Sequence, residues 1–180
     1  MKMIVTVGGS AASGKSTLAR ALAEKLRFRH VSAGQVMRGM AAERKMTLVE
    51  FSKYAEDHPE VDREIDGRQR RLAVGDCVAD GRLSRHFLNP DLSIWLTAPL
   101  GVRAARVLER GEKYGSVEEA GRDIAERDES ERRRYMRFYN IDLDDLSAYD
   151  LVINTGRFGI REMTELALRA VKSLKAQRNL

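Results

Sequence analysis

The sequence predicts an α/β fold: a five-stranded, mostly parallel sheet with helices on both faces. The strand candidates are short apolar runs, of which 28–31 is the weakest, at 3–7, 28–31, 77–79, 92–96 and 151–153. Between them, apolar residues recur at helical spacing in the segments 15–26, 34–44, 47–57, 60–74, 100–112, 117–139 and 159–177. Buried strands that alternate with helices are typical of βαβ units, which build parallel sheets.

The length of the chain and the distribution of its charges predict one domain with two inserts. A chain of 180 residues can bury one substantial core, so a single domain is expected over 1–180. The stretches at about 40–72 and about 112–139 are highly charged and interrupt the alternation of strands and helices. Substrate-binding segments and lids are typical of such positions, and plain solvated surface is the alternative.

The composition predicts a soluble cytoplasmic protein. The 32 basic and 27 acidic side chains leave a net charge of +5, which fits either a pocket for several phosphates or a surface that attracts nucleic acid. The single cysteine, Cys77, lies in an apolar run and is expected to be a buried thiol in a reducing compartment. No run approaches 18 apolar residues, so we expect neither a membrane span nor a secretory signal.

One motif, directly after the first strand, predicts phosphate binding. The pattern G-x-x-x-x-G-K-[ST] is met by a run that Thr17 follows: Gly9, Ser10, Ala11, Ala12, Ser13, Gly14, Lys15 and Ser16. In such a loop, backbone N–H groups and the N-terminus of the next helix surround phosphate oxygens. Lys15 would place its charge between the β- and γ-phosphates of ATP, and the Ser16 hydroxyl would bind Mg²⁺. The expected fold is therefore the three-layer sandwich of P-loop NTPases.

The residues after the third strand favour phosphoryl transfer over hydrolysis or switching. The strings N-K-x-D and D-x-x-G, which GTPases use, do not occur in the sequence. The strand 77–79 is followed by Asp80, Gly81 and Arg82, where a motor ATPase would carry Asp-Glu. Asp80 supplies a carboxylate for Mg²⁺, whereas Arg82 stands in place of a base and suits a second, anionic substrate. A β-turn with a surface arginine is the alternative.

Further arginines follow the predicted strands. Arg38 comes after the second strand, and Arg103 and Arg106 come after the fourth. Because active sites of open α/β sheets lie at the carboxyl ends of the strands, these side chains are expected to gather there. Their guanidinium groups would neutralise and hold the phosphates, which is most of what phosphoryl transfer requires. A phosphate acceptor is already an anion, so no general base is needed.

The second charged stretch carries a possible lid face. Arg127, Glu131 and Arg134 are spaced i, i+4 and i+7, so they share one face of the predicted helix. Such a face could close over the transferring phosphate. The alternative is an exposed helix on which Glu131 pairs with either arginine, with little effect on stability.

Taken together, these motifs resemble the nucleoside monophosphate kinase family, and within it the archaeal-type cytidylate kinases. The phosphate loop is shared by many families, but the ordered set is specific and extends over essentially the whole chain. The segments that carry the resemblance, besides the loop and the Arg127/Arg134 pair, are 30–38, 62–66, 79–83 and 149–155.

The resemblance implies an enzyme that transfers the γ-phosphate of ATP to CMP or dCMP with Mg²⁺. It implies as catalytic residues Lys15, Asp80, Arg127 and Arg134. It places ATP on residues 9–17, Arg103 and Arg106, with 154–157 near the adenine, and the metal on Ser16 and, through water, on Asp80. It makes 112–139 the lid and 40–72 the monophosphate-binding insert, which would act with Ser32, Gly34, Arg38, Asp62, Asp66 and Arg82.

One position departs from the family pattern. Bacterial cytidylate kinases follow Asp-Gly-Arg with an aspartate that reads cytosine, whereas this sequence has Leu83. The base must then be read by other groups, for which the candidates are Ser32, Asp62, Arg63 and Asp66. The alternative for the two aspartates is pairing with Arg63 or Arg68 on the surface.

Two other functions stay open from the sequence. The same chemistry could serve AMP, UMP or a small metabolite. An ATP-binding, RNA-associated factor would also use a phosphate loop and a basic surface, but the arginines follow strand ends and no basic stripe contains aromatic residues. We therefore expect a monomer that binds a nucleoside monophosphate, with no stable nucleic-acid partner and no membrane.

Overall fold

The computed structural model describes residues 2–111 and 114–178 and contains the predicted parallel sheet. Its strands are β1 (Ile4–Gly9), β2 (Arg29–Ser32), β3 (Cys77–Asp80), β4 (Leu92–Thr97) and β5 (Leu151–Asn154). They pair in the order β2-β3-β1-β4-β5, and every pairing is parallel. The weak candidate at 28–31 is confirmed as an edge strand. Of the predicted domain 1–180, residues 1, 112, 113, 179 and 180 lie outside the described residues.

The helices follow the predicted segments closely. They are α1 (Lys15–Leu26), α2 (Ala33–Glu43), α3 (Leu48–Asp57), α4 (Pro59–Leu72), α5 (Ser84–Leu88), α6 (Leu100–Glu109), α7 (Val117–Tyr139) and α8 (Ile160–Arg178). The segment 117–139 has the predicted bounds. The helix expected over 100–112 ends at Glu109, and residue 112 lies outside the described residues. The short α5 was not predicted.

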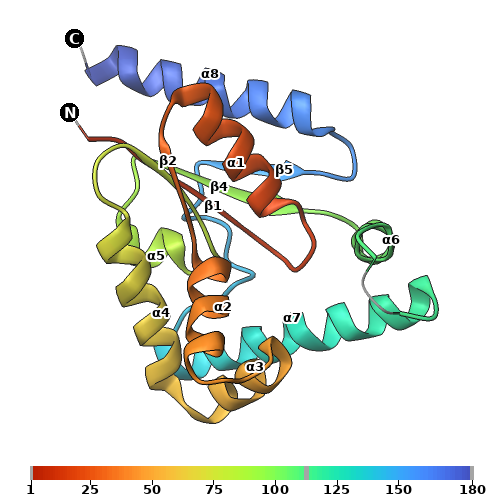
Figure 1. Cartoon of the computed structure of the whole chain (residues 1–180). Helices are drawn as coiled ribbons and strands as arrows, with labels where there is room; N and C mark the ends of the chain where they lie inside the picture. The colour runs from red at the N-terminus through yellow and green to blue at the C-terminus, as the bar shows by residue number, and fades with distance from the viewer. Residues whose placement is uncertain (1, 112–113, 179–180) are drawn as a thin grey trace.

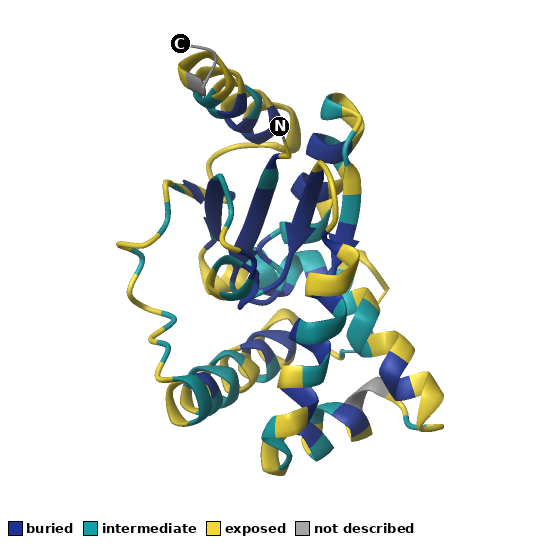
Figure 2. Ribbon diagram, turned by 90° about the vertical axis from the view of Figure 1, so that its left-hand side faces the viewer, coloured by how far each residue is buried: buried dark blue, intermediate teal, exposed yellow. Residues whose placement is uncertain are grey.

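Helices cover both faces of the sheet, which gives the three predicted layers. α1 and α8 lie together on one face (Figure 1), where their apolar side chains pack on Val5, Val7 and Ile94. On the other face, Leu88 of α5 and Ala73, just after α4, pack against β3. The buried β-strands are visible between these layers in Figure 2. The prediction of an α/β sandwich is confirmed.

The first charged stretch has a small core of its own. Helices α2, α3 and α4 bury Met40, Phe51 and Val61 against one another, while their charged side chains face outward. A capping box, in which Thr47 and Glu50 exchange hydrogen bonds, fixes the start of α3. This segment lies beyond the carboxyl ends of the strands and beside α7 (Figure 1), to which Ser130 connects it through a hydrogen bond to Glu56.

The second charged stretch is one long helix. Ser116 caps α7 by accepting from the backbone N–H of Glu119. The first half of α7 packs on α6 through Ala120 and Ile124, and the second half reaches the insert. Within 2–111 and 114–178, no helix combines the length and the apolar character that crossing a membrane requires.

Candidate active site

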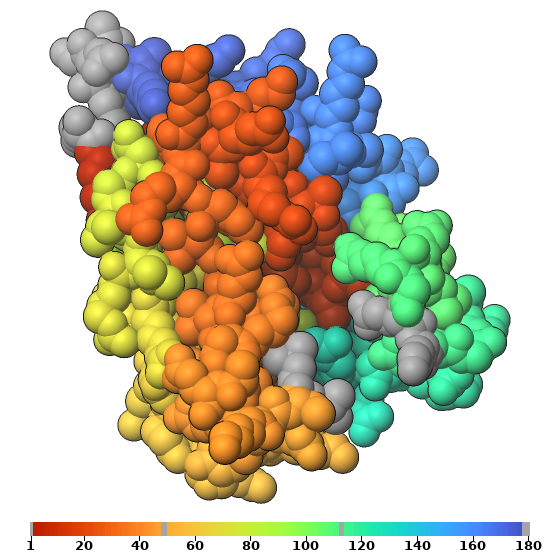
Figure 3. All heavy atoms as spheres, viewed as in Figure 1, coloured from red at the N-terminus to blue at the C-terminus, as the bar shows by residue number. Residues whose placement is uncertain are grey.

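The phosphate loop connects β1 to α1 in a conformation that depends on two glycines. Gly9 has φ 143° and lies against the carbonyl oxygen of Leu96, which leaves no room for a Cβ atom. Gly14 has φ 99° and immediately precedes the first turn of α1. Because L-residues rarely adopt such angles, the two glycines of the motif fix where the loop leaves the sheet and where it enters the helix. The loop reaches the molecular surface between the helices of the insert and α6 (Figure 3).

Lys15 lies across the loop that it follows. Its Nζ atom donates to the carbonyl oxygen of Ser10 at 2.7 Å. Burial lowers the pKa of Lys15 to about 7, and the positive charge of Arg82 adds to this effect. Three nearby carboxylates oppose the shift, those of Glu131, Asp80 and Asp128. The ammonium group is therefore held in a place where an added anion would stabilise its charge.

Asp80 ends β3 directly beside the loop. It is buried, and its Oδ2 atom lies 3.5 Å from Nε2 of His30. Burial favours the neutral acid, but polar contacts with His30, Ser16 and Ser32 outweigh it and hold the pKa of Asp80 below its usual range. A carboxylate beside the hydroxyl of Ser16 is the pair of oxygen ligands that Mg²⁺ would take. The geometry thus fits the predicted metal residues.

Arg82, predicted to hold a phosphate, contacts two carboxylates of α7. Its Nε atom is in close contact with Glu131, and its Nη2 atom lies 3.6 Å from Asp128. Asp128 also accepts from the backbone N–H of Ala11 in the phosphate loop at 3.1 Å and from Arg103 at 2.5 Å. The carboxylates of α7 are therefore bound to N–H groups of the loop and the arginines that could otherwise donate to phosphate oxygens. These contacts lower the pKa of Asp128 even though burial opposes them.

The two arginines of α6 have different partners. Arg103 donates to Asp128 and to the carbonyl oxygens of Ala11 and Ala98, so it lies at the phosphate loop as predicted. Arg106 donates instead to the side chain and the carbonyl of Thr155, after β5, at 2.7 and 2.6 Å. Thr155 in turn donates to the carbonyl oxygen of Ser13 at 2.9 Å. Arg106 thus connects to the loop through Thr155.

The C-terminal half of α7 contacts the insert. Arg134, predicted in the lid, lies 3.0 Å from Asp62 of α4, and both side chains are more than nine-tenths buried. Arg127 is exposed and has no ion pair among the described residues, so the structure does not bring the two predicted lid arginines together. Glu131 pairs with Arg82, and not with either arginine of α7 as the surface alternative required.

The two aspartates of the insert are buried, which contradicts the surface alternative. Arg68 pairs with Glu43 and Glu64 instead, and Arg63 is exposed. Burial raises the pKa of Asp62 to about 6, against the opposing charge of Arg134. It raises the pKa of Asp66 to about 7, and the charge of Asp62 adds to this effect.

The remaining predicted residues lie just before the insert, at the end of β2 and in the first turns of α2. Ser32 ends β2 and caps α2 by accepting from the backbone N–H of Gln35, so its hydroxyl serves the backbone and Asp80. Arg38 is exposed one turn along α2, with its guanidinium facing Gly34. Within the described ranges, Arg38 has no ion pair. It is therefore a cation available to a ligand.

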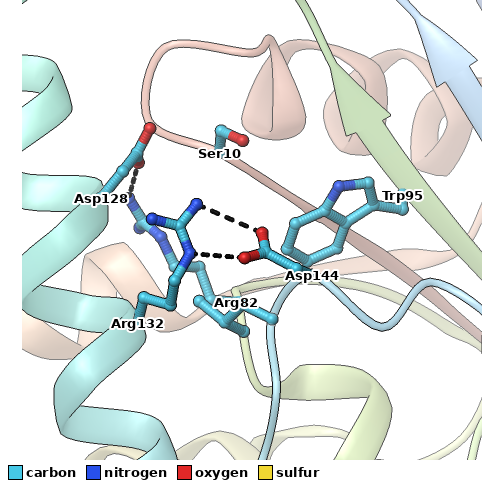
Figure 4. Close-up of a pocket in the computed structure, with 7 residues that line it drawn as sticks. Ser10, Arg82, Trp95, Asp128, Arg132 and Asp144 are labelled. Carbon is cyan, nitrogen blue, oxygen red and sulfur yellow. Dashed lines mark hydrogen bonds and ion pairs between the residues drawn. The ribbon is translucent and has the colours of Figure 1, made fainter.

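A small cavity lies where the phosphate loop, β4 and α7 meet. It measures about 30 Å³ and is lined by Ser10, Arg82, Trp95, Asp128, Arg132, Leu143 and Asp144. Figure 4 shows Arg82 and Asp128 pointing toward each other and Arg132 paired with Asp144. The pair of Arg132 and Asp144 connects α7 to the segment that leads to β5. This volume holds a water molecule and not a nucleotide.

Sequence reasoning missed three residues that shape the site: Asp128, His30 and Gln69. Gln69 is buried on α4, donates to the carbonyl of Asp80 at 2.9 Å and accepts from Ser84. A usable signal existed for Gln69, because it follows Asp62 and Asp66 at i+7 and i+3 and so shares their face. The contact of His30 with Asp80 joins neighbouring parallel strands and has no local signature.

These contacts define a class of protein. A glycine loop with its lysine, a buried carboxylate at the next strand and converging arginines are what phosphoryl transfer needs, so the chain is a kinase with the P-loop fold. The Cytidylate kinase-like family model matches residues 4–157. The chain therefore belongs to the cytidylate kinase-like family.

Individual relatives agree with this assignment. A protein named cytidylate kinase from Methanocaldococcus jannaschii is 46% identical over 179 residues, which cover 96% of this chain and 99% of that protein. One of the same name from Pyrococcus furiosus is 52% identical over 159 residues, covering 87% and 81%. Among solved structures, a shikimate kinase from Bacteroides thetaiotaomicron has a TM-score of 0.65 at 14% identity, covering 96% of this chain and 99% of its own, which supports the fold.

The buried Asp66 predicts a pH-dependent cost to stability. Its folded pKa of about 7 exceeds the usual value of 3.8 for an aspartate, so the folded state binds more protons between these values and stability falls as the pH rises from about 4 to about 7. We expect Asp66→Asn to raise the melting temperature at pH 8 by roughly 2–4 °C for each kcal/mol of charge burial that it relieves, and by much less at pH 4. Thermal melts at both pH values measure this.

The matched control is Asp57→Asn at the exposed end of α3, which should leave the melting temperature unchanged at both pH values. An equal stabilisation by Asp66→Asn at pH 4 and pH 8 would show that ionisation of Asp66 is not the cause.

Proposed function

We propose that this chain transfers the γ-phosphate of ATP to CMP or dCMP and releases ADP and the nucleoside diphosphate. The observation that supports this most is the convergence of Lys15, Arg82 and Arg103 with the phosphate loop at the carboxyl edge of the sheet. Family membership and the names of its relatives point to the same reaction. The relatives give no support to AMP, UMP or an RNA partner.

The ATP side of the site is residues 9–17. Backbone N–H groups of the loop, among them that of Ala11, would hold phosphate oxygens in place of the Asp128 carboxylate. Ser16 and Asp80 would hold Mg²⁺, the latter through water, and the ion would neutralise charge on the β- and γ-phosphates. The segment 154–157 would lie near the adenine, at a place that Arg106 and Thr155 fix relative to the loop.

The monophosphate would lie between the insert and Arg82. Arg38 and Arg82 would grip its phosphate, near the backbone of Ser32 and Gly34 at the start of α2. We assign about 40–72 as the monophosphate-binding insert and about 112–139 as the lid of a single domain. The contact of Arg134 with Asp62 supports this division, because it connects the lid helix to the insert.

Transfer itself requires positioning and charge neutralisation. The acceptor phosphate is an anion, so the chain needs to supply no base, and Lys15 and the lid arginines would stabilise charge on the moving group. Arg134 would do this from the contact between lid and insert. Arg127 is exposed, and its predicted role requires α7 to turn or shift when nucleotides bind.

A coupled ADP-release assay with each nucleoside monophosphate tests the proposed function. CMP or dCMP should be the best acceptor, with no activity after chelation of Mg²⁺. A purified chain that turns over AMP faster than CMP, or that hydrolyses ATP only with RNA present, contradicts the proposal. We expect a cytoplasmic protein that is a monomer. Size-exclusion chromatography with light scattering would check the oligomeric state.

The two inserts should move more than the sheet. Both nucleotides must enter and leave, yet water must be excluded during transfer. We expect hydrogen exchange in 40–70 and 115–139 to slow when an analogue joining adenosine and cytidine through phosphates is added. Helix α8, packed on the sheet away from the site, should be unchanged. Equal protection in both states would mean that these segments are ordinary surface helices.

A further inference from the structure

Helix α4 presents three buried polar side chains on one face, and two of them have partners. Asp62, Asp66 and Gln69 follow at i, i+4 and i+7 and are 5%, 8% and 1% exposed. Gln69 is hydrogen-bonded at the end of β3, and Asp62 is paired with Arg134 of α7. The Oδ2 atom of Asp66 is buried with neither a hydrogen bond nor an ion pair among the described residues. A buried carboxylate oxygen without a partner is costly and rare in folded proteins.

A second polar group without a partner lies at the end of α7. Tyr139 is one turn beyond Tyr135, and its ring packs edge-on against Phe87 with centroids 5.4 Å apart. Its hydroxyl is buried and, within the part of the chain that the structure describes, makes no hydrogen bond. Tyr139 lies within electrostatic range of both Asp62 and Asp66. One donor and one acceptor are thus left over between the insert and the lid helix.

We propose that Asp66 and Tyr139 bind the Watson–Crick edge of the nucleobase, whereas Asp62 positions Arg134 for the transfer step. This inference rests on the proposed function, because it assigns the base-reading groups of the same monophosphate site. It gives different roles to Asp62 and Asp66, which the sequence alone offered equally as base-reading residues. Asp62 contacts an arginine, and Asp66 does not.

The chemistry of the two groups favours cytosine. The exocyclic amine of cytosine donates to a carboxylate oxygen, and its N3 atom accepts from a phenol hydroxyl. Uracil presents a carbonyl where the Asp66 carboxylate needs a donor, and an N–H where the Tyr139 hydroxyl would have to accept instead of donate. Leaving such buried groups unpaired gives roughly 5- to 150-fold discrimination. Leu83 is itself buried and offers apolar contact only, which is consistent with a base reader on the insert.

The experiment compares kcat and KM for CMP and UMP in four variants. Asp66→Asn presents an amide that can serve uracil as well, so the ratio of kcat/KM for CMP over UMP should fall by roughly 5- to 150-fold. Tyr139→Phe should lower this ratio in the same direction while its ring still packs on Phe87. Asp62→Asn should reduce kcat with both substrates and leave the ratio unchanged. Glu165→Gln, at an exposed position of α8 outside both inserts, should match the wild type.

The outcomes separate the inference from the proposed function. A ratio that does not move in Asp66→Asn, or one that moves in Asp62→Asn instead, overturns the division of roles. A wild-type chain without activity on CMP overturns the proposed function before any variant is compared. Because a ratio of two substrates on one preparation does not depend on the amount of folded enzyme, instability of a variant does not obscure the result.

Discussion

Lys15→Ala should abolish most phosphoryl transfer while the fold stays intact. The Lys15 ammonium is buried at the phosphate loop, 2.7 Å from the carbonyl oxygen of Ser10, where the charge of bound phosphates would replace solvation. Losing one preorganised charge at the transferring group costs roughly 10²–10³ in kcat. Stability should not fall, because burial lowers the pKa of this lysine and so opposes its charge in the folded state.

Steady-state ADP release at saturating ATP and CMP measures the loss, and thermal melts check the fold. Lys25→Ala is the matched control, since Lys25 is an exposed lysine on the same helix. A Lys15→Ala enzyme that keeps half of its activity would remove the phosphate-loop assignment.

Arg82→Lys should damage use of the monophosphate far more than binding of ATP. The substitution keeps a positive charge for Asp128 and Glu131, so buried carboxylates are not left unpaired. It removes the planar fork that can hold two phosphate oxygens. We expect kcat/KM for CMP to fall roughly 10- to 100-fold, the range for a lost hydrogen bond to a charged group.

ATP binding, measured by titration without CMP, should change by less than about threefold, which is within the effect of a surface substitution. Arg85→Lys serves as the control, since Arg85 lies one turn further on and contacts the carbonyl of Ala148. Weaker ATP binding with unchanged kcat/KM for CMP would reverse the assignment of the two nucleotide sites.

The sheet could be predicted because buried parallel strands are apolar on both faces and so leave contiguous runs in the sequence. β2 was the weakest candidate because Arg29 and His30 interrupt its apolar character, as an edge strand tolerates. Helix α5 has five residues, too few to show a 3.6-residue period, so no pattern could reveal it. Helix ends shifted by one to three residues, where capping decides the last turn.

The site was predictable where it depends on strand ends, and not where it depends on a long-range pair. Asp80, Arg82 and Arg103 converge because parallel strands end at one edge. The predicted face of α7 shares Glu131 with the side that contacts the phosphate loop and Arg82, and that side carries Ile124, Asp128, Glu131 and Tyr135. Its two apolar residues mark that stripe in the sequence, whereas the spacing of arginines alone placed the exposed Arg127 on it.

The hydrogen bonds of Thr155 mean that the phosphate loop has its full support only once the residues after β5 are in place. The loop motif is complete by Ser16, yet the carbonyl of Ser13 is held by a hydroxyl 142 positions later, which Arg106 holds in turn. A fragment that stops before β5 therefore keeps every residue of the motif and loses the support of its geometry. We therefore expect ATP to bind the finished fold, so that its binding energy stabilises the whole chain as one cooperative unit instead of helping the N-terminal half to fold early.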